Sequence, residues 1–97
     1  MDGSSTVAKV AAAVQEEFTK KFSDTKVALK VTGTGTGFKE MIADRIDIAN
    51  ASRPVKESER ADCAKAGIEL VELKIALDGL TVCVNPQNDW VDTITVA

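Results

Sequence analysis

The stretch Lys-Val-Ala-Leu-Lys-Val-Thr-Gly-Thr-Gly-Thr-Gly at residues 26–37 indicates the fold class of this 97-residue chain. Apolar side chains at every second position predict a strand over residues 26–32. Residues 33–37 predict a loop, because glycine gives the backbone unusual freedom, and a short helix with apolar residues on one side follows. The order strand, glycine-rich loop and helix is typical of α/β proteins.

The same reasoning extends this pattern in both directions along the chain. Apolar residues at three- and four-residue spacing predict helices, and short apolar runs between turn residues predict strands. The predicted elements are a helix over residues 6–22 capped by Ser4, Ser5 or Thr6, a strand over 46–50, a helix over 56–66 ended by Gly67, strands over 68–75 and 80–84, a polar loop over 85–92 and the start of another element at 93–97. This alternation predicts one small α/β domain with a mostly parallel sheet flanked by helices.

The composition excludes several function classes. The net charge is −3 and no basic block is present, so nucleic acid and anionic membranes are poor candidate partners. The sequence contains no histidine and no tyrosine, which removes the commonest general base and every Ser-His-Asp or Cys-His arrangement. We therefore expect the chain not to be an enzyme, such as one that acts on phosphate esters.

Two cysteines, Cys63 and Cys83, lie twenty positions apart in the sequence. Their spacing matches no metal-binding motif, so no metal site is expected. The sequence leaves open whether they form a disulfide or remain two free thiols. No apolar run approaches the roughly 18 residues that a membrane-spanning helix needs.

Three polar segments lie where predicted strands end or predicted helices begin, which is where ligands usually bind a parallel sheet. They are Gly3–Thr6, Gly33–Gly37 and Ala51–Arg53. The first offers hydroxyls and backbone N–H groups at the positive end of a helix. The second lets a ligand approach the backbone closely, and the third offers the planar fork of Arg53 to an oxyanion.

Each segment also has a simpler interpretation. Serine and threonine at a helix start are common capping residues, the glycine-rich segment is a flexible turn, and Arg53 is a surface residue paired with an acidic side chain. The glycine-rich segment fits neither the P-loop pattern nor the dinucleotide-binding fingerprint. The occurrence of three such segments at equivalent positions favours an anion-binding site.

The motifs in these segments resemble, in the same order, those of the periplasmic phosphate-binding proteins, which have the type II periplasmic binding protein fold. They are Gly-Ser-Ser-Thr-Val at 3–7, Gly-Thr-Gly-Thr-Gly-Phe-Lys at 33–39 and Asp-Ile-Ala-Asn-Ala-Ser-Arg-Pro at 47–54. Two further stretches, Asp-Gly-Leu-Thr-Val at 78–82 and Asn-Pro-Gln-Asn-Asp-Trp-Val at 85–91, also look like that family. The resemblance therefore covers nearly the whole chain.

The resemblance implies a fold of two α/β lobes joined by a hinge, of which residues 1–97 form a single truncated part of the first lobe. It also implies that inorganic phosphate is held between the lobes by hydroxyls, backbone N–H groups and arginine, without a metal or other cofactor. Carried over by position, the phosphate contacts are Ser5, Thr6, Thr34, Gly35, Thr36, Ser52 and Arg53. In some relatives an aspartate that helps to reject sulfate occupies the position of Ser52.

The resemblance further implies the role of the parent protein. That role is the substrate-binding component of an ABC phosphate transporter, located in the periplasm or as a cell-surface lipoprotein, with a membrane permease as its partner. We expect the signal sequence, most of the first strand and the second lobe to be absent from this chain. The alternative is an isolated half-lobe that serves in folding or self-assembly and retains no ligand binding.

The first strand of such a lobe is expected in the middle of the sheet. Without it, the neighbouring strands would expose unpaired N–H and C=O groups. We therefore expect the chain to rearrange its sheet or to self-associate, with exchange of elements between copies as one route.

Overall fold

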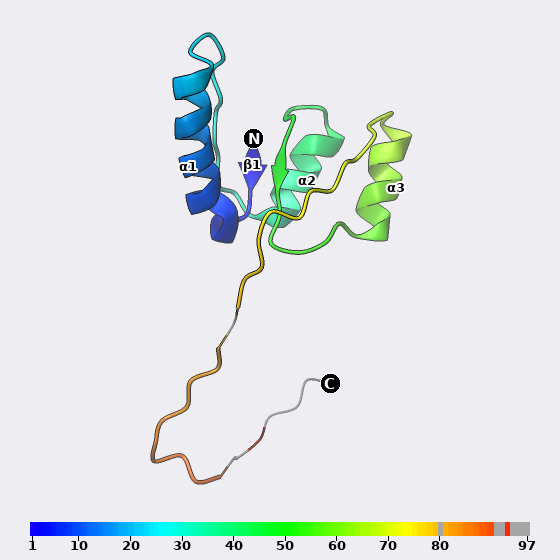
Figure 1. Ribbon diagram of the computed structural model, residues 1–97. Coiled ribbons are helices and arrows are strands. Elements are labelled where there is room, and N and C mark those ends of the chain that lie inside the picture. The colour runs from blue at the N-terminus through cyan, green and yellow to red at the C-terminus, as the bar shows by residue number, and fades with distance from the viewer. Residues whose placement is uncertain (80, 91–92, 94–97) are drawn as a thin grey trace.

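The chain has an α/β fold in which helices surround a short parallel sheet (Figure 1). The computed structural model describes residues 1–79, 81–90 and 93. Along the described residues, the elements are β1 (Asp2–Gly3), α1 (Ser5–Lys21), α2 (Thr34–Ile42), β2 (Ala49–Asn50) and α3 (Glu57–Lys65). This order confirms the predicted fold class.

Strand β1 lies between two neighbouring segments, as expected for the first strand. It pairs with β2 in parallel, and the Asp2 N–H donates to the Ile48 carbonyl at 3.1 Å. On its other side, the Met1 ammonium donates to the Ala28 carbonyl at 2.8 Å, and the Lys30 N–H donates to the Met1 carbonyl at 3.0 Å. Met1, which directly precedes β1, thus bonds to both residue 28 and residue 30, which is the pattern of a parallel strand pair. The chain around β1 therefore joins residues 28–30 to β2.

Several predicted strands are wrong or shorter than expected. No strand forms over residues 26–32, 68–75 or 81–84. The strand predicted over 46–50 is confined to Ala49–Asn50. A strand needs a partner for its backbone groups, and among the described residues the hydrogen bonds that join the main chain of residues 26–32 to other main-chain groups are the two with Met1. The remaining predictions, at Leu80 and over most of 91–97, lie outside the described residues.

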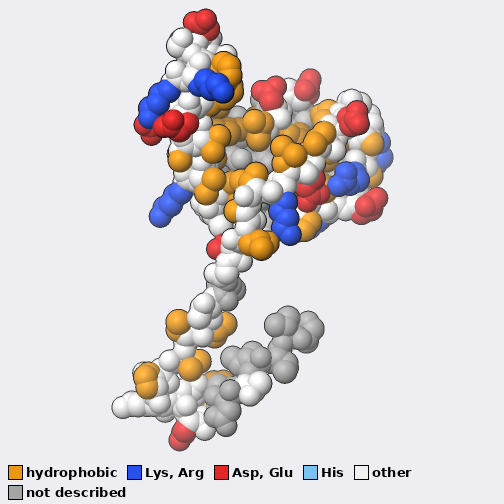
Figure 2. All heavy atoms as spheres, in the orientation of Figure 1, with side chains coloured by type: hydrophobic (Ala, Val, Ile, Leu, Met, Phe, Trp, Pro, Cys, Tyr) orange, Lys and Arg blue, Asp and Glu red, His pale blue; other side chains and the backbone are white. Residues whose placement is uncertain are grey.

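Helix α1 follows its prediction closely, beginning and ending one residue earlier than the predicted range. Ser4 is the N-cap, because its Oγ accepts the Thr6 N–H at 3.2 Å. The predicted apolar face is largely uncovered, however: only Ala11 is buried, while Val14 is 61% exposed. Apolar side chains gather over the middle of the face seen in Figure 2, between α1 and α3, and recur along the extended segment after α3.

Helix α2 begins at Thr34, so most of the predicted glycine-rich loop is helical. Gly33 is the N-cap and has a φ of 99°, a backbone conformation that glycine adopts without strain. Gly37 lies inside the helix against β1, where a Cβ atom would be 2.9 Å from the Asp2 carbonyl oxygen. The next residue, Phe38, is buried, so close packing onto β1 outweighs the poor helix propensity of the glycines.

Helix α3 matches the prediction to within one residue at each end, and Gly67 follows it with a φ of 75°. Among the described residues, the buried apolar side chains are Ala11, Phe38 and Cys63. Cys63 is fully buried, which raises the pKa of its thiol, whereas Cys83 is exposed. Both thiols are free, which answers the question left open by the sequence.

Replacement of Gly37 by alanine should destabilise the fold. The added methyl group would collide with backbone atoms of β1, and we expect a loss of about 1–3 kcal/mol in the free energy of unfolding. Gly35→Ala in the same helix is the matched control, since its Cβ position meets no atom within 4 Å apart from its chain neighbours and its own helix backbone. Alanine there should be neutral or stabilising by up to about 1 kcal/mol. Urea unfolding followed by circular dichroism measures both, and equal effects would contradict the close approach of α2 to β1.

Candidate functional site

Backbone hydrogen bonds bring the three polar segments to one edge of the sheet. The Ser4 N–H donates to the Asn50 carbonyl at 2.8 Å, and the Gly33 N–H donates to the Gly3 carbonyl at 2.7 Å. These bonds join the start of α1, the start of α2 and the end of β2. Figure 1 shows that α1 and α2 begin at the same end of the sheet.

A buried carboxylate fixes the entry to α2. Asp2 is 2% exposed, and its Oδ2 accepts the Thr32 hydroxyl at 2.9 Å while its Oδ1 accepts the Gly3 N–H at 2.7 Å. Thr32 directly precedes the N-cap Gly33. The side chain of Asp2 therefore ties the segment before α2 to β1.

Two helix N-termini lie at this edge, and at α1 the Ser4 hydroxyl already accepts the Thr6 N–H. Ser5 and Thr6 are exposed in the first turn of α1. The first turn of α2 contains Thr34, Gly35 and Thr36, and its N-cap Gly33 has no side chain that could accept their N–H groups. Free N–H groups and the helix dipole make such ends favourable places for an anion.

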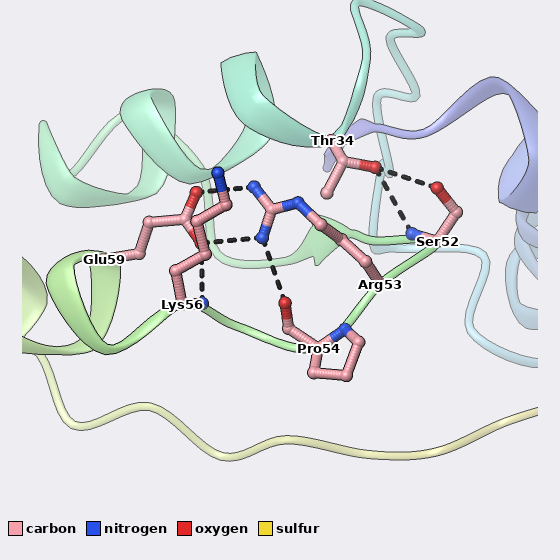
Figure 3. A network of polar contacts seen from close by, with 6 residues as sticks. All are labelled: Thr34, Ser52, Arg53, Pro54, Lys56 and Glu59. Atoms are coloured by element: carbon pink, nitrogen blue, oxygen red, sulfur yellow. Dashed lines mark hydrogen bonds and ion pairs between the residues drawn. The ribbon is translucent and has the colours of Figure 1, made fainter. Parts of the chain in front are cut away.

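The hydroxyls of Thr34 and Ser52 lie together between the two segments that carry them (Figure 3). Their oxygens are 3.2 Å apart, and the Ser52 N–H donates to Thr34 Oγ1 at 3.3 Å. Both bonds are exposed to solvent, so these groups are also accessible to a ligand. The structure thus joins the second and third predicted segments.

Arg53 points away from this pair of hydroxyls and towards α3 (Figure 3). Its Nη1 donates to Glu59 Oε2 at 2.9 Å and its Nη2 donates to Glu59 Oε1 at 2.7 Å, while Nη1 also donates to the Pro54 carbonyl at 3.0 Å. Its guanidinium carbon lies 5.3 Å from the centre of the Phe38 ring. Arg53 thus pairs with an acidic side chain, which is the simpler of the two interpretations that the sequence offered for this residue.

Glu59 is the residue of this region that sequence reasoning missed. It is the third residue of α3, and its Oε2 accepts the Lys56 N–H at 2.9 Å, which caps the helix. The hydrogen bonds from Arg53 lower the pKa of Glu59 to about 2, and the Lys56 N–H acts in the same direction. A glutamate at the third position of a predicted helix is a signal for this capping role.

The described residues contain no group of His, Cys, Asp and Glu side chains that could hold a metal ion. Helices long and apolar enough to cross a membrane are likewise not found in the part of the chain that the structure describes. Two shallow hollows lie along α1, where residues such as Gln15 and Phe18 line them, and neither includes a candidate residue. The candidate donors at this edge of the sheet are backbone N–H groups and hydroxyls, while Arg53 points away from it.

The fold and this edge define a class of binding protein. The chain belongs to the PBP superfamily domain family, whose model matches residues 1–97.

Named relatives of known sequence are similar over almost the whole chain. Protein SphX of Synechococcus elongatus is 51% identical over 96 residues, which cover 99% of this chain. The phosphate-binding protein PstS of Staphylococcus aureus is 45% identical over 93 residues, which cover 96% of this chain. The chain spans 28% of the length of each of these two relatives.

A solved structure agrees with the sequence relatives. The crystal structure of a possible phosphate binding protein from Planctomyces limnophilus has a TM-score of 0.83 and 50% sequence identity. The match covers 92% of this chain and 31% of that one. The arrangement of α1, α2, α3 and the sheet thus matches one part of that longer chain.

The Arg53–Glu59 pair should make stability depend on pH in the acidic range. Glu59→Gln should lower the free energy of unfolding by about 1 kcal/mol at neutral pH. Because the pKa of Glu59 in the folded chain is about 2, below its usual value of 4.5, its contribution is complete above the usual value and is lost as the pH falls towards 2. Urea unfolding from pH 7 to 3 should show the difference between variant and unmodified chain shrink below about pH 4.5.

The matched control for this measurement is Glu57→Gln, which changes an exposed carboxylate in the same helical turn. Its effect should be smaller than that of Glu59→Gln at neutral pH. A difference for Glu59→Gln that stays constant down to pH 3 would contradict the ion pair.

Proposed function

We propose that this chain is part of the substrate-binding component of an ABC phosphate transporter and binds inorganic phosphate through one half of a site. Residues 1–97 act as a single part of one lobe, and the other half of the site belongs to a second lobe. Two proteins that match nearly all of this chain support this proposal. One is named a phosphate-binding protein, and the other, the solved structure, is described as a possible phosphate binding protein.

The observation that carries the proposal is the meeting of two helix N-termini with a pair of hydroxyls. The starts of α1 and α2 are joined through β1, and Thr34 Oγ1 lies 3.2 Å from Ser52 Oγ. A chain with a net charge of −3 cannot attract an anion by overall charge. Oriented N–H groups and hydroxyls bind an oxyanion locally, because they donate to its oxygens without requiring a counter-ion.

The residues assigned to phosphate follow from this geometry and from their positions. The first turn of α1 and the first turn of α2 supply hydroxyl and backbone donors, and the end of β2 supplies the hydroxyl of Ser52. Arg53 is assigned from its position in the motif alone, because its guanidinium points away from this edge and pairs with Glu59. The proposed contacts are Ser5, Thr6, Thr34, Gly35, Thr36, Ser52 and Arg53.

The proposed role requires binding and release, not chemistry. The site contains donors for phosphate oxygens but no histidine that could act as a general base. We propose that the protein is not an enzyme, needs no cofactor, and delivers phosphate to a membrane permease from the periplasm or as a cell-surface lipoprotein. An isolated half-site leaves part of the ligand in water, so we expect a Kd in the millimolar range.

A titration followed by NMR tests phosphate binding directly. Phosphate added to the labelled chain, up to the order of tens of millimolar, should shift the amide signals of residues 4–6, 33–37 and 52–53, and sulfate should shift them less. Thr34→Val removes the shared hydroxyl and should weaken binding about three- to tenfold. Thr25→Val changes an exposed threonine beyond the end of α1 and should leave binding unchanged. Absence of any shift would show that the alternative, a half-lobe without ligand binding, is correct.

Self-association is a second candidate property, favoured by the apolar side chains after α3. Val71, Leu73, Ile75 and Leu77 alternate along an extended segment and are each at least 65% exposed. Such alternation suits a strand with one apolar face, and exposed apolar surface favours association. We propose that copies of this chain pair through this segment.

Sedimentation velocity should show the average mass rise with protein concentration. Leu73→Lys should reduce association, because it places a charge on the apolar side of the segment. Lys74→Ser alters the neighbouring residue on the opposite side and should leave association nearly unchanged. A monomer at all concentrations would contradict the proposal.

A further inference from the structure

The ion pair between Arg53 and Glu59 differs from the others in its burial. Among the ion pairs of the described residues, it is the one in which both side chains are less than a third exposed, at 32% and 15%. Both carboxylate oxygens of Glu59 are used, because Oε1 and Oε2 each accept from the guanidinium, and Oε2 also accepts the Lys56 N–H. A two-bond pair of this kind fixes orientation as well as distance.

The donors of Arg53 show how completely this side chain is held. A guanidinium has five N–H groups. Two on Nη1 are used by Glu59 and the Pro54 carbonyl, and one on Nη2 is used by Glu59. The ring of Phe38 lies beside the guanidinium, with 5.3 Å between its centre and the guanidinium carbon. Three elements, α2, α3 and the segment after β2, thus restrict Arg53.

The hydrogen bonds that hold Arg53 also restrict the position of Ser52, the residue before it. In Figure 3, Ser52 points towards Thr34 and Arg53 points in another direction, towards Glu59. A large rotation of the backbone between the two residues would displace the Arg53 side chain and strain its three hydrogen bonds. The Ser52 hydroxyl and N–H are then kept at 3.2 Å and 3.3 Å from Thr34 Oγ1, although both bonds are exposed to water.

We propose that Glu59 is a positioning residue of the anion half-site, which acts through Arg53 to fix Ser52 against Thr34. Glu59 itself is not a ligand, since its negative charge would repel phosphate. The identity of the ligand rests on the proposed function, but the positioning of Ser52 does not. The pair therefore links the start of α3 to the edge where α1 and α2 begin.

The test compares Glu59→Gln with Glu57→Gln in the labelled 97-residue chain without phosphate. The Ser52 amide hydrogen reports directly on its bond to Thr34, so its exchange with solvent should become about three- to tenfold faster in Glu59→Gln. Its NMR signal should shift in the direction produced by Thr34→Val. Glu57→Gln should change neither. A role of Glu59 confined to capping α3 would alter the signals of α3 and leave Ser52 unchanged, which would overturn the proposal.

A second variant keeps the test decisive if Glu59→Gln unfolds the chain. Arg53→Lys keeps the positive charge, but its single ammonium cannot form two parallel bonds with Glu59. It should also accelerate exchange at Ser52, and an unchanged Ser52 signal in a folded Arg53→Lys chain would contradict the proposal.

Phosphate titration then links positioning to binding. Glu59→Gln should weaken phosphate binding about three- to tenfold, and Thr34→Val added to it should cost less than it does alone, because both changes disrupt one unit. Fully additive effects would show that Glu59 acts elsewhere. If no chain responds to phosphate, the proposed function fails, while exchange at Ser52 still decides whether Glu59 positions that residue.

Discussion

The structure depends on the two hydrogen bonds that join the end of β1 to its neighbours. The Gly3 carbonyl accepts the Gly33 N–H, and the Asn50 carbonyl accepts the Ser4 N–H. Since each of these residues lies at the start of a helix or the end of a strand, two bonds set the relative positions of α1, α2 and the segment after β2. The close packing of Gly37 on β1 is part of the same arrangement.

The same constraint explains how an acidic chain can present the proposed anion site. Neutral N–H groups of two helices and the hydroxyls of Thr34 and Ser52 face one edge, and their effect is local. The positive charge of Arg53 is already shared with Glu59. Such a site favours an oxyanion through geometry more than through charge, which agrees with the phosphate-binding relatives of this chain.

Most of the apolar surface of the described chain is not buried against itself. The side chains of Val14, Leu73 and Trp90 are all more than half exposed, and the buried apolar set is small. The relatives are more than three times longer, and their further residues offer surfaces that this chain alone does not contain. The local arrangement of the candidate site nevertheless forms, because it rests on backbone hydrogen bonds near β1.

The sequence by itself determined the α/β class, the three helices to within a few residues at their ends and the Gly67 end of α3, and it narrowed the cap of α1 to Ser4, Ser5 or Thr6, because helix bonds and caps join residues close in sequence. It also pointed to the segments that form the site edge. Only the tertiary structure decided that residues 26–32 and 68–75 form no strands, that α2 begins at Thr34, and that Arg53 binds Glu59 while Ser52 binds Thr34. Most of these outcomes depend on partners distant in the chain or on packing against β1, which local sequence patterns do not specify. Arg53 and Glu59 lie only six residues apart, but the sequence offers several acidic side chains near Arg53 and does not specify which one it pairs with.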